Sequence, residues 1–240
     1  MSRLLYFKYK NDNLDGYPLM QRFTLLHDGS DQGWQAAYLA FHIAAQLGAP
    51  LFALLVGSAS DEKILARNAS QVEVGGRAAG LVIKTRLVTE FSVDIVEENV
   101  ADSDGLFVPR RLIPDEETAA RFLEASSCPL WIVSKEAEMH KMAVLVDDLA
   151  ADKALITFTA TLSNRLQQSL TGLVRKDEIA LTSDTDESIS WLPLEDFSPA
   201  EINATLNQLG AGLLFLPLSR LSLVHELSLN CVIYPAMQDA

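Results

Sequence analysis

The clearest alternation of apolar and polar positions lies in residues 23–57. Two short apolar runs, residues 23–26 and 51–56, flank a stretch whose apolar residues recur at helical spacing: Ala36, Leu39, Ala40, Ile43 and Leu47. Gly48 ends that stretch, as expected of a helix C-terminus. Runs of strand length that are apolar throughout are typical of strands buried on both faces of a parallel sheet. The segment therefore predicts a strand–helix–strand unit with its helix over residues 32–47.

The same alternation continues to residue 134. It predicts strands at residues 81–89, 104–109 and 130–133, and helices at residues 61–80, 92–99 and 114–127. The pair Gly75-Gly76 interrupts the second helical stretch and favours a loop or a kink there. Five strands alternating with four helices describe a doubly wound parallel sheet.

The pattern then begins again, which indicates an internal repeat. The second copy predicts strands at residues 142–146, 170–175, 189–194, 212–217 and 231–234, and helices at residues 152–166, 199–209 and 223–228. It is reduced, because residues 176–188 form only a polar, acidic loop where the first copy has a helix. The predicted fold is therefore α/β, with two doubly wound five-stranded parallel-sheet domains packed as a pseudo-dimer.

The repeat also sets the domain boundaries that we expect. Residues 1–22 form an N-terminal extension, residues 23–138 the first domain and residues 139–240 the degenerate second domain. Residues 4–9 of the extension alternate enough to predict a short strand, which packs on a sheet edge or is swapped between subunits.

The net charge and the cysteine content limit the classes of partner that the protein can bind. With 19 Lys and Arg against 32 Asp and Glu, the formal net charge of −13 argues against nucleic acid and anionic membranes. The two cysteines, Cys128 and Cys231, provide neither a disulfide framework nor metal-ligand spacing. No signal peptide or bilayer-spanning run is recognisable. A cytoplasmic protein with a small-molecule ligand fits these features, and association of two copies stays an open alternative.

Candidate binding residues follow from the strand ends. Ligands of parallel α/β sheets bind at the carboxyl ends of the strands. Asp28, Gly29 and Ser30 follow the first predicted strand, and Arg110 and Arg111 follow the fourth. The two arginines can grip a phosphate or a carboxylate, or they can pair with Asp115 and Glu116 and tie down their own loop. Asp28 can likewise hold a ligand, or Asp28 or Ser30 can cap the following helix.

Three segments, in this order, resemble the universal stress protein family. A strand ends in Asp28-Gly29-Ser30, an Ala-rich helix closes in Leu47-Gly48-Ala49, and Cys128-Pro129 precedes an apolar strand. Tandem members of that family are similar in length to this chain. The resemblance implies an adenine nucleotide α-hydrolase-like fold with a five-stranded parallel sheet in each domain. It also implies ATP or AMP as the ligand, with adenine near Asp28 and against Val56 and Gly57.

The glycine-rich phosphate site that the resemblance implies is missing here. The family carries Gly-x2-Gly-x9-Gly-Ser/Thr after the fourth strand, whereas Pro109 begins a stretch without glycine that runs to Glu117. Prolines remove the N–H donors that phosphate needs, and Asp115, Glu116 and Glu117 place negative charge at the next helix N-terminus. Such carboxylates cost on the order of 1–4 kcal/mol per pair with phosphate oxygens. Residues 217–220 lack glycine too, so we expect the usual ATP site to be lost in both copies.

Recognisable catalytic and metal-binding patterns are also missing from the sequence. His27, His42, His140 and His225 are scattered without ligand spacing, and no phosphate loop, dinucleotide fingerprint or hydrolase elbow occurs. The pair Asp147-Asp148 is interpreted as turn chemistry, because adjacent strand-end side chains point in opposite directions. We therefore assign no catalytic and no metal-binding residue.

Three functions remain as hypotheses. The first is a stress-response-type binding or regulatory protein that does not bind ATP in the usual mode of the family. The second keeps AMP or ATP in an altered mode, held by Asp28, Val56 and Arg110, with weak ATPase activity. The third is an unrelated α/β enzyme whose acidic residues meet only in the fold. No cofactor is assigned, and any pocket is expected in the first half.

Overall fold

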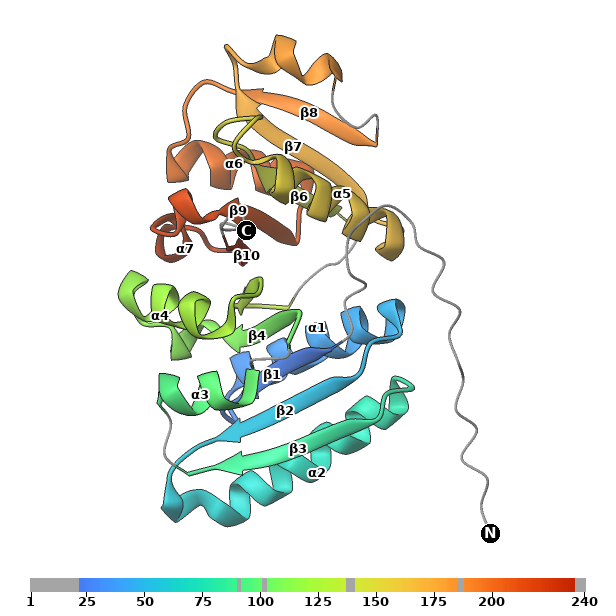
Figure 1. Cartoon of the computed structure of the whole chain (residues 1–240), viewed down its shortest axis with the longest axis vertical. Coiled ribbons are helices and arrows are strands. Elements are labelled where there is room, and N and C mark those ends of the chain that lie inside the picture. The colour runs from blue at the N-terminus through green and yellow to red at the C-terminus, as the bar shows by residue number, and fades with distance from the viewer. Residues whose placement is uncertain (1–21, 90–91, 101–102, 137–140, 185–187, 236–240) are drawn as a thin grey trace.

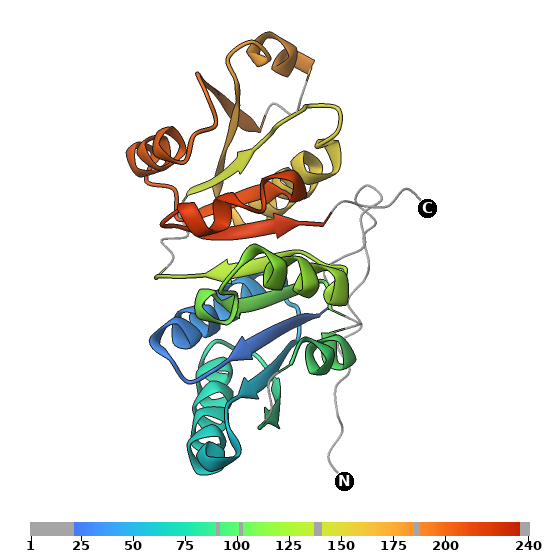
Figure 2. The same cartoon turned by 90° about the vertical axis from the view of Figure 1, so that its left-hand side faces the viewer.

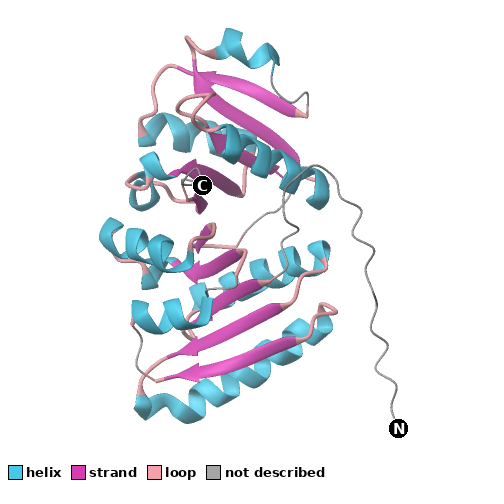
Figure 3. Ribbon diagram, in the orientation of Figure 1, coloured by secondary structure: helices cyan, strands magenta, loops and turns pink. Residues whose placement is uncertain are grey.

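The computed structural model describes residues 22–89, 92–100, 103–136, 141–184 and 188–235. Within them the chain forms one elongated stack of strands, covered by helices on both faces (Figure 1). Figure 3 shows the same three layers coloured by secondary structure. The predicted α/β class is confirmed.

The first half alternates strands and helices as predicted. Its strands are β1 (Phe23–His27), β2 (Leu51–Val56), β3 (Ile83–Val88), β4 (Gly105–Pro109) and β5 (Leu130–Val133). Its helices are α1 (Asp31–Leu47), α2 (Glu62–Ala78), α3 (Val93–Val100) and α4 (Glu116–Ser126). Short 3₁₀ turns η1 (Ala59–Asp61) and η2 (Arg110–Leu112) follow β2 and β4.

The second half repeats this order with fewer helices. Its strands are β6 (Lys141–Leu145), β7 (Ser169–Arg175), β8 (Ile189–Leu194), β9 (Leu213–Pro217) and β10 (Asn230–Tyr234). Its helices are α5 (Lys153–Leu166), α6 (Pro199–Leu209) and α7 (Leu223–Glu226), with 3₁₀ turns η3 (Ile179–Asp184) and η4 (Leu218–Arg220). Within its described part, the segment expected to be a loop over residues 176–188 contains the 3₁₀ turn η3.

The ten described strands form one continuous sheet in the order β3-β2-β1-β4-β5-β10-β9-β6-β7-β8. Counted outward from the centre, the strands of each half follow the same order: fifth, fourth, first, second and third. All neighbouring pairs are parallel except β5 and β10, which meet antiparallel at the middle. The two halves therefore form the predicted pseudo-dimer, joined edge to edge through their fifth strands (Figure 2).

Strand register gives the residue-by-residue correspondence between the halves. Phe23 pairs with Leu51 and Gly105, and Met142 pairs with Leu170 and Leu213. Met142 thus corresponds to Phe23, which makes Asp147 the counterpart of Asp28. By the same count Arg175 corresponds to Val56, and Pro217 corresponds to Pro109.

Two apolar cores lie on the two faces of the sheet. One packs α1, α2 and α5 against alternate strand residues such as Leu25 and Val144. The other packs α3, α4, α6 and α7 against the intervening residues, among them Leu26 and Leu145. Because successive strand side chains point to opposite faces, strands buried on both sides must be apolar throughout. That requirement explains the unbroken apolar runs in the sequence.

An aromatic row crosses the junction between the halves. Trp131 of β5 stacks on Phe107 at 4.8 Å between ring centroids and meets Phe215 of β9 edge-on at 5.9 Å. All three side chains are fully buried. Phe158 of α5 continues the row against Phe215. Aromatic pairs of this kind add about 0.5–1.5 kcal/mol each to the area that they bury, so the junction is part of the core.

Two polar side chains also tie the halves together. Asn230, fully buried at the start of β10, accepts hydrogen bonds from the backbone N–H groups of Ser134 and Lys135 and donates to the Lys135 carbonyl. Arg110 donates from Nη1 to the Leu227 carbonyl at 2.7 Å and from Nη2 to the Leu229 carbonyl at 2.8 Å. The backbone at the end of α7 and the start of β10 is thereby bound to the first half.

The prediction of a loop or kink at Gly75-Gly76 is wrong. Both residues lie within the continuous helix α2. A Cβ on Gly76 would come within 2.0 Å of Ile83 Cδ1, and one on Gly75 within 2.9 Å of the Phe41 ring. The glycines therefore let the end of α2 pack closely against β3 and α1, a tertiary reason that the helical pattern does not contain.

The short strand expected at residues 4–9 and the rest of the extension up to residue 21 lie outside the described residues. Among the residues that are described, no helix combines the length and apolar character that crossing a bilayer requires.

Asn230 offers a direct test of the junction. In Asn230→Ala, the partly buried N–H groups of Ser134 and Lys135 lose the acceptor that the fully buried Asn230 provides, so we expect the free energy of unfolding to fall by roughly 1–3 kcal/mol. Urea denaturation followed by tryptophan fluorescence measures this loss. Asn207→Ala, which removes an exposed amide on α6, is the matched control and should change stability by less than about 0.5 kcal/mol. Equal effects of the two variants would contradict a structural role for Asn230.

Candidate functional site

The residues predicted to form a site gather at the carboxyl edge of the first half of the sheet. Asp28, Gly29 and Ser30 connect β1 to α1, Val56 ends β2 and Pro109 ends β4. Since β1 pairs with both β2 and β4, these ends lie next to one another. This edge is the point where the strand order reverses, the usual ligand position in open α/β sheets.

Asp28 and Ser30 organise the start of α1. Asp28 Oδ1 accepts hydrogen bonds from the backbone N–H and the hydroxyl of Ser30, at 3.1 and 2.6 Å. Ser30 Oγ in turn accepts from the Gly33 N–H at 3.0 Å and is the N-cap of the helix. Of the two roles considered for this pair, capping is therefore observed, with Ser30 as the cap and Asp28 as its support.

Gly29 and Gly33 leave no room beside the aspartate. Gly29 has φ of +76°, and a Cβ there would meet Asn68 Nδ2 at 2.7 Å. A Cβ on Gly33 would lie 2.6 Å from Asp28 Oδ1. Gly29 is thus required by the left-handed backbone of the turn, and Gly33 by the close approach of the Asp28 carboxylate.

Arg111 covers the second oxygen of Asp28. Its Nε lies 2.8 Å from Asp28 Oδ2, and the side chain of Asp28 is only 5% exposed while that of Arg111 is 59% exposed. Asp28 Oδ2 is buried and accepts no hydrogen bond from the described residues, so the contact is an ion pair alone. The Arg111 N–H donates to Gln32 Oε1 of α1, which fixes η2 against the turn below it. The aspartate expected to face a ligand faces an arginine of its own chain.

The structure separates the two neighbouring arginines. Arg111 pairs with Asp28, whereas Arg110 points to the second half, where it binds the carbonyls of Leu227 and Leu229. The alternative in which both pair with Asp115 and Glu116 is therefore wrong. Asp115 instead caps α4 by accepting from the Thr118 N–H at 2.8 Å. The arginines cross to distant elements because η2 turns the chain directly after Pro109.

The second half contains the same kind of pair. Asp147, the counterpart of Asp28, accepts hydrogen bonds from Arg220 Nε and Nη2 at 2.6 to 2.8 Å, and from the Ser219 hydroxyl at 2.9 Å. Burial alone would raise the pKa of Asp147, but the hydrogen bonds from Arg220 and Ser219 outweigh it and leave that pKa below the usual value. An arginine following the fourth strand thus neutralises the aspartate following the first strand in both halves.

Hydrogen bonds within the following turn hold the acidic pair Asp147-Asp148 at the end of β6. Asp148 Oδ1 accepts from the N–H groups of Ala150 and Ala151, which confirms turn chemistry for this residue. Asp152 Oδ2 accepts from the N–H groups of Asp147 and Asp148. Burial raises the pKa of Asp152, and the neighbouring acids add to that effect. No group of three or more His, Cys, Asp and Glu side chains in the described ranges is arranged to hold a metal ion.

His27 is a buried titratable group directly below the site. It is fully buried, its Nδ1 accepts a hydrogen bond from the Gly29 N–H at 3.1 Å, and its ring meets Trp34 edge-on at 4.4 Å. Burial lowers the pKa of His27 to about 4, although the charge of Asp28 acts in the opposite direction. The imidazole is therefore neutral at pH 7 and supports the turn that presents Asp28.

Both cysteines are buried free thiols. Burial raises the pKa of Cys128 to about 12 and that of Cys231 to about 11. Neither thiol has the thiolate character that a nucleophile or a redox group requires.

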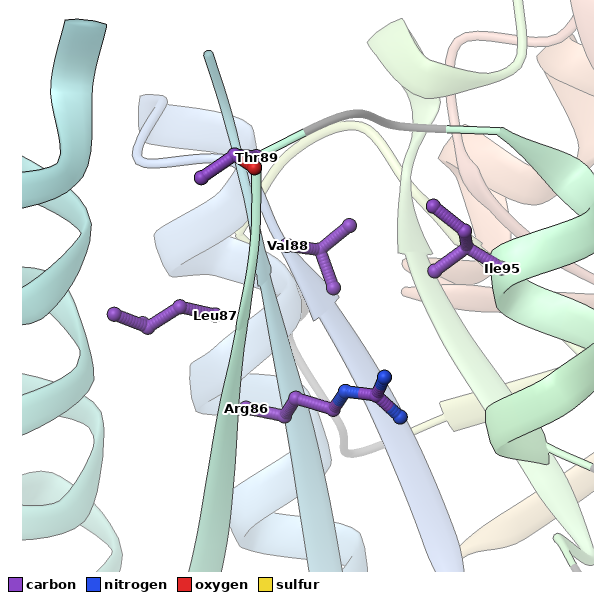
Figure 4. Close-up of a pocket in the computed structure, with 5 residues that line it drawn as sticks. All are labelled: Arg86, Leu87, Val88, Thr89 and Ile95. Atoms are coloured by element: carbon purple, nitrogen blue, oxygen red, sulfur yellow. The ribbon is translucent and has the colours of Figure 1, made fainter. Parts of the chain in front are cut away.

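Two cavities lie away from the eight residues predicted for the site. One of about 260 Å³ opens between β3 and α3 and is lined by Arg86, Leu87, Val88, Thr89 and Ile95. Figure 4 shows Arg86 and Val88 directed toward α3, with Leu87 on the opposite side of the strand. The other, of about 270 Å³, lies at the carboxyl edge of the second half and is lined by Arg175, Glu195, Asp196, Phe197 and Arg220.

Sequence reasoning missed the residues around this second cavity. Arg175 ends β7 at the position where Val56 ends β2. Arg220 lies three residues after Pro217, whereas Arg111 lies two residues after Pro109. A register-exact alignment of the two halves would have shown the exchange of a valine for an arginine. The shift by one residue hides Arg220, because Arg111 aligns with Ser219.

Comparison with known proteins identifies the fold. No protein-family model matches the sequence, and none of the curated proteins is a match. Among solved structures, a universal stress protein from Archaeoglobus fulgidus aligns over 92% of this chain and 99% of its own, at 12% identity and a TM-score of 0.70. A functionally unknown protein from Pseudomonas aeruginosa PAO1 aligns over 90% of this chain and 92% of its own, at 14% identity and a TM-score of 0.66. The chain has the tandem fold of universal stress proteins, as the sequence resemblance predicted.

The pKa of His27 predicts a pH dependence of stability. Unfolded histidine takes up its proton near pH 6.5, whereas folded His27 does so only near pH 4. Between these values the unfolded state binds more protons, so stability is fully present above pH 6.5 and falls as the pH drops toward 4. We expect a loss of about 2 kcal/mol between pH 7 and pH 5 that is attributable to this residue.

Urea denaturation of the wild type and of His27→Gln at both pH values measures that loss. The variant should show the shallower pH dependence, by the amount given above. His42→Gln, which changes an exposed histidine on α1, is the matched control and should retain the wild-type slope. If His27→Gln loses as much stability on acidification as the wild type, the assignment of the slope to His27 fails.

Proposed function

We propose that this chain is a tandem universal stress-type binding and regulatory protein that does not hold ATP in the usual mode of that family. The assignment to stress response rests on the shared fold. The departure from ATP rests on one observation, the ion pair between the strand-end aspartate and an arginine of the same chain. The same ion pair is present in both halves. This supports a function in which neither aspartate is free to contact a ligand.

The ion pair opposes adenine binding at Asp28 for a physical reason. Oδ1 already accepts two hydrogen bonds from Ser30, and Oδ2 lies against Arg111 Nε. A base would have to displace Arg111 before it could reach the carboxylate. Displacement of one partner leaves a charge with 5% exposure without compensation, and such a step carries a penalty of several kcal/mol in a buried site.

The backbone after β4 is equally unsuited to polyphosphate. Pro109 is followed by η2 and then by Ile113, whose N–H donates to the Arg110 carbonyl. The N–H of Arg111 donates to Gln32, and that of Thr118 donates to Asp115. Donors that a phosphate would need are thus engaged within the chain, and Glu116 and Glu117 stand in the first turn of α4.

The second hypothesis, AMP or ATP in an altered mode, is supported by the exposure of Arg111. Its side chain is 59% exposed, so the guanidinium can swing toward an incoming phosphate and release Asp28 Oδ2. In that case Arg111, rather than Arg110, is the phosphate-binding residue, because Arg110 is engaged with the second half.

The domain division follows from the same repeat. We propose domains at residues 23–138 and 139–240, supported by the identical strand order of the halves and by their single antiparallel contact between β5 and β10. A cytoplasmic location and association of two copies stay predictions from the sequence.

Nucleotide binding by the wild type and by Arg111→Ala tests the proposal. Thermal shift with AMP, and with ATP and Mg²⁺, at millimolar concentration should leave the wild type unchanged, since a ligand stabilises only if it binds the folded state. Extraction of freshly purified wild-type protein should release no adenine nucleotide. Removal of Arg111 opens Asp28, so the variant should gain stabilisation by AMP.

Arg121→Ala, which removes an exposed arginine on α4, is the matched control and should behave as the wild type. A large stabilisation of the wild type by ATP and Mg²⁺, or co-purified nucleotide, would contradict the proposal that the Asp28–Arg111 ion pair prevents nucleotide binding. It would favour the second hypothesis. In that event Arg111→Ala should lose nucleotide affinity rather than gain it.

A further inference from the structure

The cavity at the carboxyl edge of the second half contains two guanidinium groups around one aromatic ring. The Cζ atoms of Arg175 and Arg220 lie 5.5 and 5.3 Å from the centroid of Phe197, which is 8% exposed. The cavity of about 270 Å³ is bounded further by Glu195 and Asp196, which follow β8. It lies beside the closed Asp147–Arg220 pair and does not include Asp147 among its lining residues.

Arg175 distinguishes this edge from its counterpart in the first half. The register places it at the position of Val56, which is buried at the end of β2. Arg175 is exposed and forms no ion pair with any described residue. An unpaired guanidinium fork held over an aromatic ring is a ready binding group for a carboxylate.

Of the charged residues that line the cavity, only Arg175 and Asp196 form no ion pair with a described residue, and the charge of Arg175 also acts on Asp147 and Glu178. Arg220 is neutralised by Asp147, and Glu195 is paired with Lys176. Asp196 forms no ion pair in the described part of the chain and accepts a hydrogen bond from the Ser198 N–H at 2.7 Å. Hydrogen bonds from Ser198 hold the pKa of Asp196 below its usual value, so its carboxylate is charged at neutral pH.

Arg175 and Asp196 line the same cavity without pairing with each other. Two opposite charges that line one small cavity are complementary to a molecule that carries both charges itself. Each charged group of such a ligand would form a charge-assisted hydrogen bond, which is stronger than a neutral one. Phe197 lines the same cavity and supplies apolar surface there.

We propose that this cavity binds a small zwitterion, an α-amino acid with an apolar side chain. Its carboxylate contacts Arg175, its ammonium group contacts Asp196 and its side chain packs against Phe197. The site lies in the second half, so this proposal does not depend on whether the ion pair with Arg111 keeps ligands away from Asp28. The same charges disfavour polyphosphates, because Asp196 repels them and Arg220 is already engaged.

Three probes of one shape test the role of each charge. L-leucine carries both groups, 4-methylpentanoate lacks the ammonium group and 3-methylbutylamine lacks the carboxylate. Isothermal titration calorimetry and ligand-observed NMR on the full chain, at low ionic strength, should show that L-leucine binds at least 10-fold more tightly than either analogue. Arg175→Gln and Asp196→Asn should each weaken L-leucine binding at least 10-fold.

The variants also separate the two ends of the ligand. Arg175→Gln should leave the weak binding of the amine unchanged, and Asp196→Asn should leave that of the carboxylate unchanged. Arg165→Gln and Asp94→Asn remove equal charges at exposed helical positions and should bind L-leucine as the wild type does. Thermal denaturation of all four variants checks that they fold.

The proposal is overturned if L-leucine fails to bind at 10 mM, if the two analogues bind as tightly as L-leucine, or if the two control variants lose binding equally. Selective loss in Arg175→Gln and Asp196→Asn supports it. Neither outcome depends on whether the wild type binds adenine nucleotides, so this proposal and the closure of Asp28 can fail separately.

Discussion

The antiparallel contact between β5 and β10 is the constraint on which the rest of this structure depends. It joins two five-stranded sheets into one ten-stranded sheet and leaves β3 and β8 as its outer edges. Without it, Trp131 and the apolar residues of β10 would face water. The pairing also brings Arg110 of one half within reach of the backbone that leads into β10 of the other. The two halves therefore share the apolar core on each face of the sheet.

The reuse of one interaction at both sheet edges is the most informative feature of the sites. In each half the aspartate after the first strand is neutralised by an arginine from the turn after the fourth strand. The two pairs differ in strength. Arg220 donates directly to both oxygens of Asp147 with its side chain 27% exposed, whereas Arg111 contacts one oxygen of Asp28 and is largely exposed. The second half is thus the more firmly closed at its aspartate, and the first half is the one that a ligand could open more readily.

The reduced second half is not an inert copy. The sequence places any pocket in the first half, yet a cavity lies at the carboxyl edge of the second, where Arg175 replaces the valine that ends β2. A repeat that has lost a helix can still acquire a distinct set of charges at the same edge. Both edges keep the paired aspartate, and only the second adds Arg175 and Asp196 around a cavity. An internal duplication allows such divergence, because each copy can change without altering the other.

The sequence by itself determined the order of the elements, the repeat and the class of fold. Residues 189–194 and 199–209 match their strand and helix at both ends, because these local patterns report burial directly. The position of Asp28 at a strand end was likewise predictable from the apolar run before it. Only the tertiary structure decided which partner each charged group has. Arg110, Arg111 and Arg220 bind residues between 73 and 119 positions away. Gly75 and Gly76 allow close packing against α1 and β3, and Asp196 lines the same cavity as Arg175. Such pairings depend on register and on the direction of side chains across neighbouring strands, and a one-residue shift, as between Arg111 and Arg220, removes them from any linear pattern.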